Sequence, residues 1–238
     1  MLKEKPWQLH LVLRLIAGLC ACVALSFLIV NGYANSRGVN ADDQVSVLVG
    51  LTGTLIAHGV GLLLINVFLK QHQLTWAEAF GVQRNGAARA LLLGWFMAVL
   101  MLPVSWSLNL LSGWILEWFN GSTDVQSSIK LLQKTQNFGQ LAYFGVVAIV
   151  FAPVFEELVF RGILYPFIKR LYARKVAIWV SSFLFAAIHW NAMTFLPLTV
   201  FAVVLCLLYE TTGTIFAPMF AHACFNAANF FYVVVFKS

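Results

Sequence analysis

Two adjacent carboxylates, Glu156 and Glu157, lie in a stretch that is apolar enough to cross a lipid bilayer. An ionised carboxylate at membrane depth is costly unless it is paired or hydrated, so it indicates a functional site. Arg161 follows Glu157 by four residues, a spacing that places both side chains on one helix face and suits an ion pair. Glu156 then points about 100° away from that pair and is predicted to act as a general base.

Further polar groups occur in later apolar segments, at His189, His222 and Asn226. With a helical rise of 1.5 Å per residue, Glu156, His189 and His222 would all lie about 12–20 Å from one membrane face. We therefore expect these three side chains to line one water-filled cavity that opens to the cytoplasm. Asn226 lies four residues after His222, so the two could donate hydrogen bonds to one developing oxyanion.

Two prolines accompany this group, Pro153 before Glu156 and Pro218 before His222. Each removes a helix hydrogen bond, and each predicts a kink that admits water. A glutamate in a low dielectric beside a second carboxylate is a competent base near neutral pH, so the chemistry predicted is hydrolysis by an activated water.

A zinc site is the main chemical alternative, because Glu156, His189 and His222 could supply three ligands and leave a fourth position for water. The sequence has no His-Glu-x-x-His helix motif, so the preferred prediction is metal-free hydrolysis, with no cofactor and with zinc possible. Purely structural roles also remain open. Glu157 and Arg161 could only tie helices together, and Asn226 and Asn229 could be interhelical hydrogen-bonders.

His58 is interpreted as a packing residue, because the pattern offers it no acidic partner. Glu210, Thr211 and Thr212 are predicted to form a turn at the end of the sixth apolar segment.

The composition requires a membrane fold to position these residues. The 238 residues are 61% hydrophobic and only 10% charged, whereas soluble domains carry roughly 25% charged residues. Four cysteines lie in apolar stretches and are interpreted as small buried side chains rather than disulfides. The sequence thus predicts an all-α membrane protein, a polytopic bundle of about seven transmembrane helices, formed by one membrane domain over residues 1–238.

The predicted spans follow from runs of about 20 apolar residues. The first is interpreted as an uncleaved span rather than a signal peptide, because its apolar run is too long. The fifth and sixth should form a tight hairpin, with Pro197 at the start of the sixth, where a helix tolerates it. Residues 72–86 are predicted to be an interfacial helix. The seven spans are 10–31, 45–69, 89–113, 141–164, 176–191, 195–210 and 213–236.

Positive charge is unequal between the loops. One side receives Lys3, Lys5 and the cations that follow the second and the fourth predicted spans. The other side receives only Arg37, Lys130, Lys134 and Lys237. The positive-inside rule assigns the richer side to the cytoplasm. We expect a multi-pass protein of the cell membrane with a cytoplasmic N-terminus. The net charge of +6 is explained by this pattern, so nucleic acid is not an expected partner.

Three ordered motifs resemble one known family. They are Glu156-Glu157-x-x-x-Arg161, Phe185-x-x-x-His189 and His222-x-x-x-Asn226, which are similar to those of the CPBP (Abi / CAAX prenyl protease type II) intramembrane endopeptidases. The resemblance covers about the last hundred residues, with a catalytic core expected over 141–236.

The resemblance implies a role for each matching position. Glu156 and His189 would activate a water, His222 and Asn226 would stabilise the oxyanion, and Glu157, Arg161 and Phe185 would support them. It also implies that no metal is obligatory.

The function expected is therefore that of an intramembrane endopeptidase, a CAAX-type peptide hydrolase that cuts a membrane or lipid-anchored protein or peptide. Its partners would be that substrate and the lipid bilayer. Two rivals belong to other classes. One is a non-proteolytic partner or regulator with the same fold, and the other is a transporter with a Glu/His proton relay, which the absence of related halves disfavours.

Overall fold

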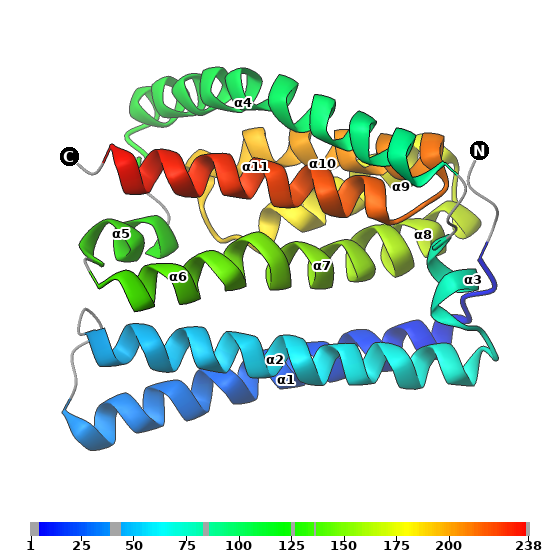
Figure 1. The fold of residues 1–238 in the computed structure, drawn as a ribbon, viewed down its shortest axis with the longest axis horizontal. Helices are drawn as coiled ribbons and strands as arrows, with labels where there is room; N and C mark the ends of the chain where they lie inside the picture. Colours follow the sequence, from blue (N-terminus) through cyan, green and yellow to red (C-terminus); the bar gives the residue numbers. More distant parts are fainter. Residues whose placement is uncertain (1–4, 39–43, 83–85, 125–126, 136, 237–238) are drawn as a thin grey trace.

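The computed structural model describes residues 5–38, 44–82, 86–124, 127–135 and 137–236, and over these residues the chain is an all-α bundle (Figure 1). Six helices of this described part are long and apolar enough to cross a membrane. The elements are α1 (Leu9–Arg37), α2 (Gln44–Gln71), α3 (Trp76–Phe80), α4 (Ala87–Trp118), α5 (Ser127–Lys134), α6 (Phe138–Val146), π-helical η1 (Val147–Phe151), α7 (Ala152–Glu157), π-helical η2 (Leu158–Leu164), α8 (Tyr165–Leu171), α9 (Arg174–Ala187), α10 (Ala192–Thr212) and α11 (Phe216–Val235).

The elements from α6 to α8 form one continuous span, Phe138–Leu171, which corresponds to the predicted fourth span. The α1–α2 hairpin packs along one side of it, while α4, α9, α10 and α11 lie on the other side (Figure 1). The span that carries Glu156, Glu157 and Arg161 is therefore central, and residues from both sides can reach it.

The predicted fifth span is shorter than expected. Helix α9 has 14 residues, about 21 Å at 1.5 Å per residue, whereas a bilayer core is about 30 Å thick. The helix ends at Ala187, so His189 lies in a turn rather than within a span. Asn191 then starts α10, because its side chain accepts a hydrogen bond from the backbone N–H of Thr194 at 2.9 Å.

Helix α10 is longer than predicted at both ends. Pro197 lies inside it rather than at its start. Glu210, Thr211 and Thr212, expected to form a turn, are instead its last helical residues. The helix ends at Gly213, which adopts the left-handed conformation with φ of 69°, a geometry that glycine adopts without strain.

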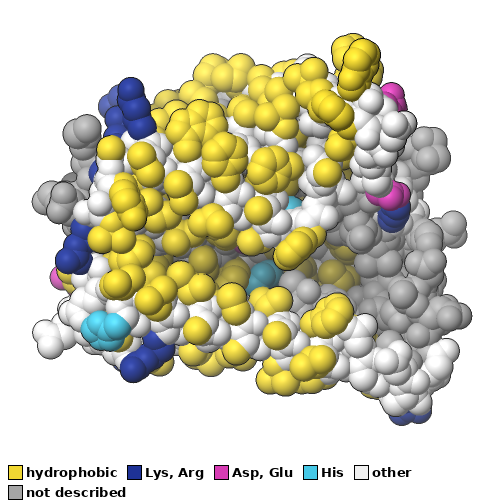
Figure 2. Space-filling view, turned by 180° about the vertical axis from the view of Figure 1, so that it is seen from behind, with side chains coloured by type: hydrophobic (Ala, Val, Ile, Leu, Met, Phe, Trp, Pro, Cys, Tyr) yellow, Lys and Arg dark blue, Asp and Glu magenta, His cyan; other side chains and the backbone are white. Residues whose placement is uncertain are grey.

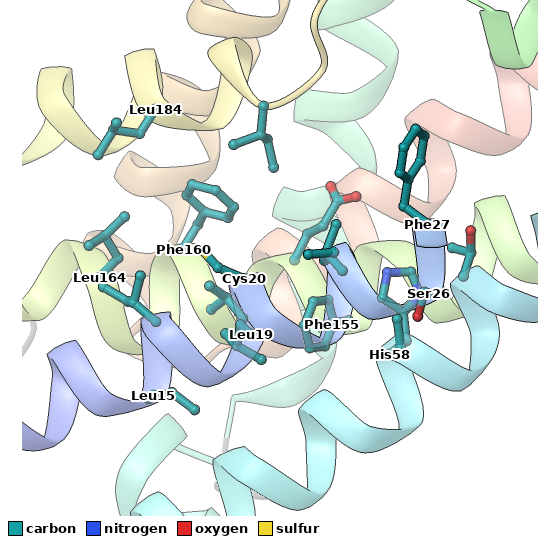
Figure 3. Close-up of a pocket in the computed structure, with 18 of the residues that line it drawn as sticks. Leu15, Leu19, Cys20, Ser26, Phe27, His58, Phe155, Phe160, Leu164 and Leu184 are labelled. Atoms are coloured by element: carbon teal, nitrogen blue, oxygen red, sulfur yellow. The ribbon is translucent and has the colours of Figure 1, made fainter. Parts of the chain in front are cut away.

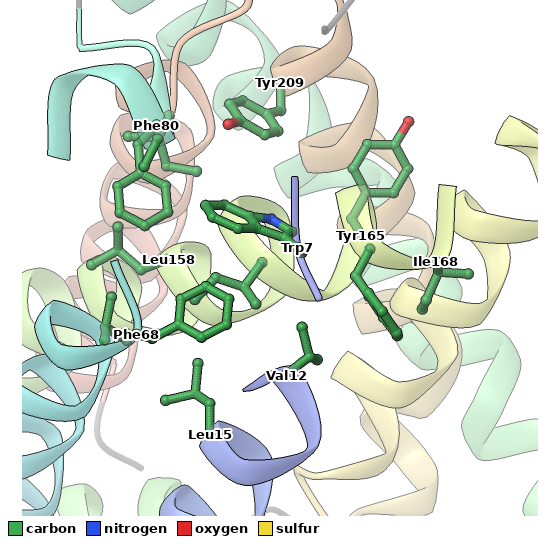
Figure 4. Close-up of a cluster of buried hydrophobic side chains, with 14 of the residues drawn as sticks. Trp7, Val12, Leu15, Phe68, Phe80, Leu158, Tyr165, Ile168 and Tyr209 are labelled. Atoms are coloured by element: carbon green, nitrogen blue, oxygen red, sulfur yellow. The ribbon is translucent and has the colours of Figure 1, made fainter. Parts of the chain in front are cut away.

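A buried aromatic cluster closes the end of the bundle where the chain begins (Figure 4). Trp7, just before α1, is fully buried and packs against Phe68 of α2 with ring centroids 5.0 Å apart. Its indole N–H donates to the carbonyl of Gly162 at 3.2 Å. The start of α1 is thus anchored to the central span, while large side chains farther along α1, such as Phe27 and Leu28, are exposed.

Only part of the predicted interfacial segment 72–86 is helical. Helix α3 covers Trp76–Phe80 and begins with a capping box in which Thr75 and Glu78 bond each other's backbone N–H groups. Phe80 is fully buried, and its carbonyl accepts a hydrogen bond from Ile215 N–H at 3.0 Å. The helix is therefore docked against the bundle through Phe80, while Trp76 stays exposed.

The outer surface is broadly apolar, with most of the visible cationic side chains at one end of the apolar band (Figure 2). That end carries the starts of α1, α4 and α9 and the ends of α2 and α8 (Figure 1). Exposed large hydrophobic residues occur on every long helix, as expected for helices that face lipid. The chain is a multi-pass membrane protein.

Candidate active site

The central span changes its hydrogen-bond register where its prolines occur. In η1 the N–H of Ala152 bonds the carbonyl of Val147, five residues back. The next bond of this kind would come from residue 153, but Pro153 has no N–H. The carbonyl of Ala148 instead accepts a hydrogen bond from the side-chain amide of Asn226 on α11, at 2.9 Å.

The same compensation occurs one π-helical stretch later. Pro166 cannot donate to the carbonyl of Gly162, four residues back, and that carbonyl accepts from Trp7. Both freed carbonyls are therefore bonded by side chains from distant elements, which keeps the span continuous through its apolar surroundings. Pro218 was expected to remove an interior helix hydrogen bond and kink its span, but it is only the third residue of α11. A helix N–H there has no intrahelical partner, so no interior bond is lost.

Glu157 and Arg161 form a fully buried ion pair on the central span. Arg161 Nη1 donates to Glu157 Oε1 at 2.9 Å, and the side chains are 1% and 0% exposed. The other guanidinium nitrogen, Nη2, donates to the carbonyl of Ala202 on α10 at 3.1 Å. The guanidinium also lies 4.5 Å from the ring centroid of Phe185 on α9, a cation–π distance. This pair links three helices.

His222 on α11 connects this pair to Glu156. Its Nδ1 lies 2.8 Å from Glu157 Oε1, so Nδ1–H donates to that carboxylate. The other ring nitrogen, Nε2, faces Glu156 Oε2 at 3.8 Å, which is longer than a direct hydrogen bond. Phe185 and Phe201 hold the imidazole between them in edge-on contacts with centroids 5.7 and 5.6 Å away. The result is an ordered relay from Arg161 through Glu157 and His222 to Glu156.

Glu156 faces a large cavity rather than the ion pair. The cavity has a volume of about 980 Å³ and lies between α1 and α2 on one side and α7, η2 and α9 on the other (Figure 3). Its walls are mostly aliphatic and aromatic, with Glu156 and His58 as the lining side chains that can carry charge near neutral pH. On α1 the lining runs from Val12 to Val30, a length of about 27 Å. Figure 2 shows a hollow in this face with histidine inside it.

His189 approaches from the turn between α9 and α10. Its Nδ1 lies 2.7 Å from the carbonyl of Phe185, so Nδ1–H donates and Nε2 keeps a free lone pair. Its neighbours Ile188 and Trp190 line the cavity. In the described part of the chain, no hydrogen bond or ion pair joins His189 to Glu156 or His222. Of the three residues expected to line one cavity, only Glu156 lines this one.

Asn226 lies one turn after His222 and is half-buried. One N–H of its amide bonds the carbonyl of Ala148, which leaves the second N–H of the same group available. Asn229, expected as a possible interhelical hydrogen-bonder, accepts from Trp106 of α4 at 3.3 Å and donates to Phe225.

His58 of α2 packs on Phe155 with ring centroids 4.6 Å apart, and it also lines the cavity with Glu156, although no hydrogen bond or ion pair joins the two in the described chain. Glu210 has partners that the sequence did not indicate. Glu210 is buried and accepts a hydrogen bond from Tyr165 at 2.6 Å and a second bond from Lys169. Glu210 lies opposite the cationic residues of 169–175. The sequence does not reveal this arrangement, because it depends on how α8, α9 and α10 pack together.

Glu156, His189 and His222 are the three ligands that the zinc alternative requires. Over the residues that the structure describes, no group of three or more His, Cys, Asp or Glu side chains is arranged to hold a metal ion. The polar groups instead form pairwise contacts, with Glu157 at their centre.

The C-terminal region is similar to known proteins. Residues 138–228 match the model of a family described as type II CAAX prenyl endopeptidase Rce1-like. The uncharacterized protein YpbD of Bacillus subtilis (strain 168) is 35% identical over 76 residues, which are 30% of this chain and 36% of that relative. The chain thus spans about a third of the length of the curated relative it matches, and no solved structure matches it.

The matched region contains the four residues of the relay. It also contains Asn226 and the turn that carries His189. It also overlaps the core predicted over residues 141–236. Residues 138–228 of this membrane protein are therefore similar to the Rce1-like family of type II CAAX prenyl endopeptidases.

Proposed function

We propose that this protein is an intramembrane endopeptidase that hydrolyses a peptide bond of a membrane or lipid-anchored substrate through a water activated by Glu156. The observation that carries the proposal is the approach of His222 Nε2 to Glu156 Oε2, 3.8 Å apart, beside the cavity that Glu156 lines. One oxygen atom fits between two polar groups at that separation, as bridging waters do.

Glu156, His222 and His189 have separate roles in activating the water. Glu156 removes a proton from the attacking water and later returns it to the leaving amine. His222 is held in one orientation by Glu157, so its Nε2 stays directed at the reacting oxygen. His189, with its Nδ1–H committed to Phe185, offers Nε2 to the same water once substrate is bound.

The second N–H of the Asn226 amide donates to the tetrahedral oxyanion, because the bond to Ala148 fixes the amide in advance. The reaction needs no metal. Arg161 and Phe185 hold Glu157 and His222 in place rather than contacting substrate.

The cavity suits a substrate with an apolar anchor. Its walls extend for most of the length of α1 and are mostly apolar, and Glu156 is the acidic side chain that lines it. A lipid-linked peptide could place its scissile bond at Glu156 and its chain against the apolar walls. We further propose that the protein resides in the cell membrane with the cation-rich end, including the N-terminus, in the cytoplasm. Reporter fusions at the two ends of the chain test this orientation.

Glu156→Gln tests the reaction. We expect the purified variant to lose about 10²–10⁴-fold in cleavage of a fluorogenic lipidated CAAX peptide, because the amide cannot act as a base. Its melting temperature in detergent should match wild type, and Glu117→Gln, an exposed glutamate of α4, should retain full activity. Wild-type activity in Glu156→Gln would refute the assignment. A wild-type protein with no hydrolysis of peptides or membrane extracts would favour the non-proteolytic partner role.

A further inference from the structure

His58 lies on α2, outside the region that matches the family, and it lines the cavity drawn in Figure 3. Glu156 lines the same cavity. Its ring packs on Phe155, the residue before Glu156, with centroids 4.6 Å apart and an interplanar angle of 37°. Its Nδ1 is buried and has no hydrogen-bond partner among the described residues. An imidazole at membrane depth with an unpartnered ring nitrogen indicates a functional role.

The cavity brings this imidazole and the Glu156 carboxylate into one space. No Lys or Arg side chain lines the cavity within the described chain, and His58 is its one lining side chain that can become cationic. No hydrogen bond or ion pair joins its ring directly to Glu156 in the described chain, so a polar contact between the two groups would run through a water in the cavity that both line. His222 also approaches Glu156, but its Nδ1 is already committed to Glu157.

We propose that His58 is a positioning residue, whose ring N–H donates to a water in the shared cavity that in turn bonds the Glu156 carboxylate and holds it in its ionised, water-activating orientation. The α1–α2 hairpin thus supplies a working part of a site whose other members lie on α7, α9 and α11. The role in catalysis rests on the proposed protease function, whereas the effect on the Glu156 carboxylate does not.

Two substitutions separate positioning from packing. His58→Phe keeps a ring against Phe155 but removes both ring nitrogens. His58→Gln loses the ring but keeps an N–H donor of similar reach. If His58 only packs, the phenylalanine variant should resemble wild type and the glutamine variant should be impaired. If it positions Glu156, the order is reversed.

The first measurement does not require proteolysis. A hydrophobic carbodiimide reacts with protonated carboxyl groups, and labelling of Glu156 can be followed by mass spectrometry of purified protein, with Glu156→Gln as the blank. A hydrogen bond to the carboxylate favours its ionised form. We expect His58→Phe to be labelled about 3- to 10-fold faster than wild type, and His58→Gln to stay near wild type. Equal labelling rates in wild type and His58→Phe would overturn the proposal.

The second measurement is cleavage of the lipidated peptide. We expect kcat of His58→Phe to fall about 10-fold with KM nearly unchanged, since an interaction that acts through the base affects the chemical step. The melting temperature should not fall. A loss confined to His58→Gln, or a loss that follows melting temperature, would contradict positioning. Failure of wild type to cleave would instead count against the protease function, and the labelling result would still decide the role of His58.

Discussion

The matched region, residues 138–228, and the α1–α2 hairpin are both apolar and helical, but they hold their polar groups differently. In the matched region Glu157, Arg161 and His222 are almost completely buried and bond one another. In the hairpin the polar side chains mostly bond backbone carbonyls of their own helix, as Asn31 bonds Phe27 and Thr54 bonds Gly50. Two side chains of α2 face the matched region instead: His58 lines the cavity with Glu156, and Thr52 accepts a hydrogen bond from Tyr143 at 3.3 Å.

This difference shows how a polar site is held in place within an apolar bundle. A polar group that bonds its own helix does not restrict how that helix packs against others, whereas a polar group that bonds another helix restricts how the two helices pack. The matched region is therefore held in one arrangement by its polar contacts, and the hairpin needs separate attachment. That attachment is the Trp7 cluster at one end (Figure 4), and it leaves most of α1 to serve as a cavity wall.

The largest effect on stability should come from breaking the buried pair. Arg161→Ala leaves Glu157 buried without its cation, which should cost about 3–5 kcal/mol of unfolding free energy. Arg14→Ala, an exposed arginine of α1, should leave stability unchanged. Thermal unfolding of both variants in detergent measures the contrast. A normal melting temperature for Arg161→Ala, together with weaker substrate binding, would show that this arginine contacts substrate instead.

A matched pair of asparagines tests the same contrast in catalysis. Asn226 bonds a carbonyl of another helix, and Asn31 bonds a carbonyl of its own. We expect Asn226→Ala to lower kcat by about 10²–10³-fold, or 2.7–4 kcal/mol, the loss typical of a removed oxyanion donor. Asn31→Ala should match wild type. A fall in melting temperature without a fall in kcat per folded molecule would restrict Asn226 to satisfying Ala148.

The attachment of the α1–α2 hairpin through Trp7 can be weakened without changing the polar contacts of the matched region. Trp7→Phe keeps most of the buried ring but removes the donor to Gly162, leaving a buried carbonyl unpaired at a cost of about 1–3 kcal/mol. Trp118→Phe, at a position 84% exposed, provides the control and should have no effect. Chemical denaturation in mixed micelles measures both. Equal stability of the two variants would mean that other contacts of the cluster hold the hairpin.

The smallest effect is expected from metal removal. Because Glu156 activates the water and Asn226 donates to the oxyanion in the proposed mechanism, a chelator should leave the cleavage rate unchanged. Elemental analysis of active protein should find well under one zinc per chain. Stoichiometric zinc, with activity lost on its removal and regained on its return, would establish the zinc-dependent alternative.

The sequence by itself determined the all-α membrane fold, because apolar runs of helical span length admit little else. It also identified the Glu157–Arg161 pair, since residues four apart on one helix meet wherever that helix is placed. The chemistry predicted for Glu156, His189 and Asn226 stays a prediction. Its basis is local spacing and resemblance, and neither reports what these side chains contact across helices.

Tertiary structure decided the contacts between helices. The bond between His222 and Glu157 joins residues 65 positions apart, and no helical period encodes it. The position of His189 depended on where α9 ends, and an apolar run does not mark such an end. His58 and Glu156 face one cavity because the hairpin packs beside the central span. Local geometry follows from the chain, but a partner from another helix is known only after packing has selected which faces meet.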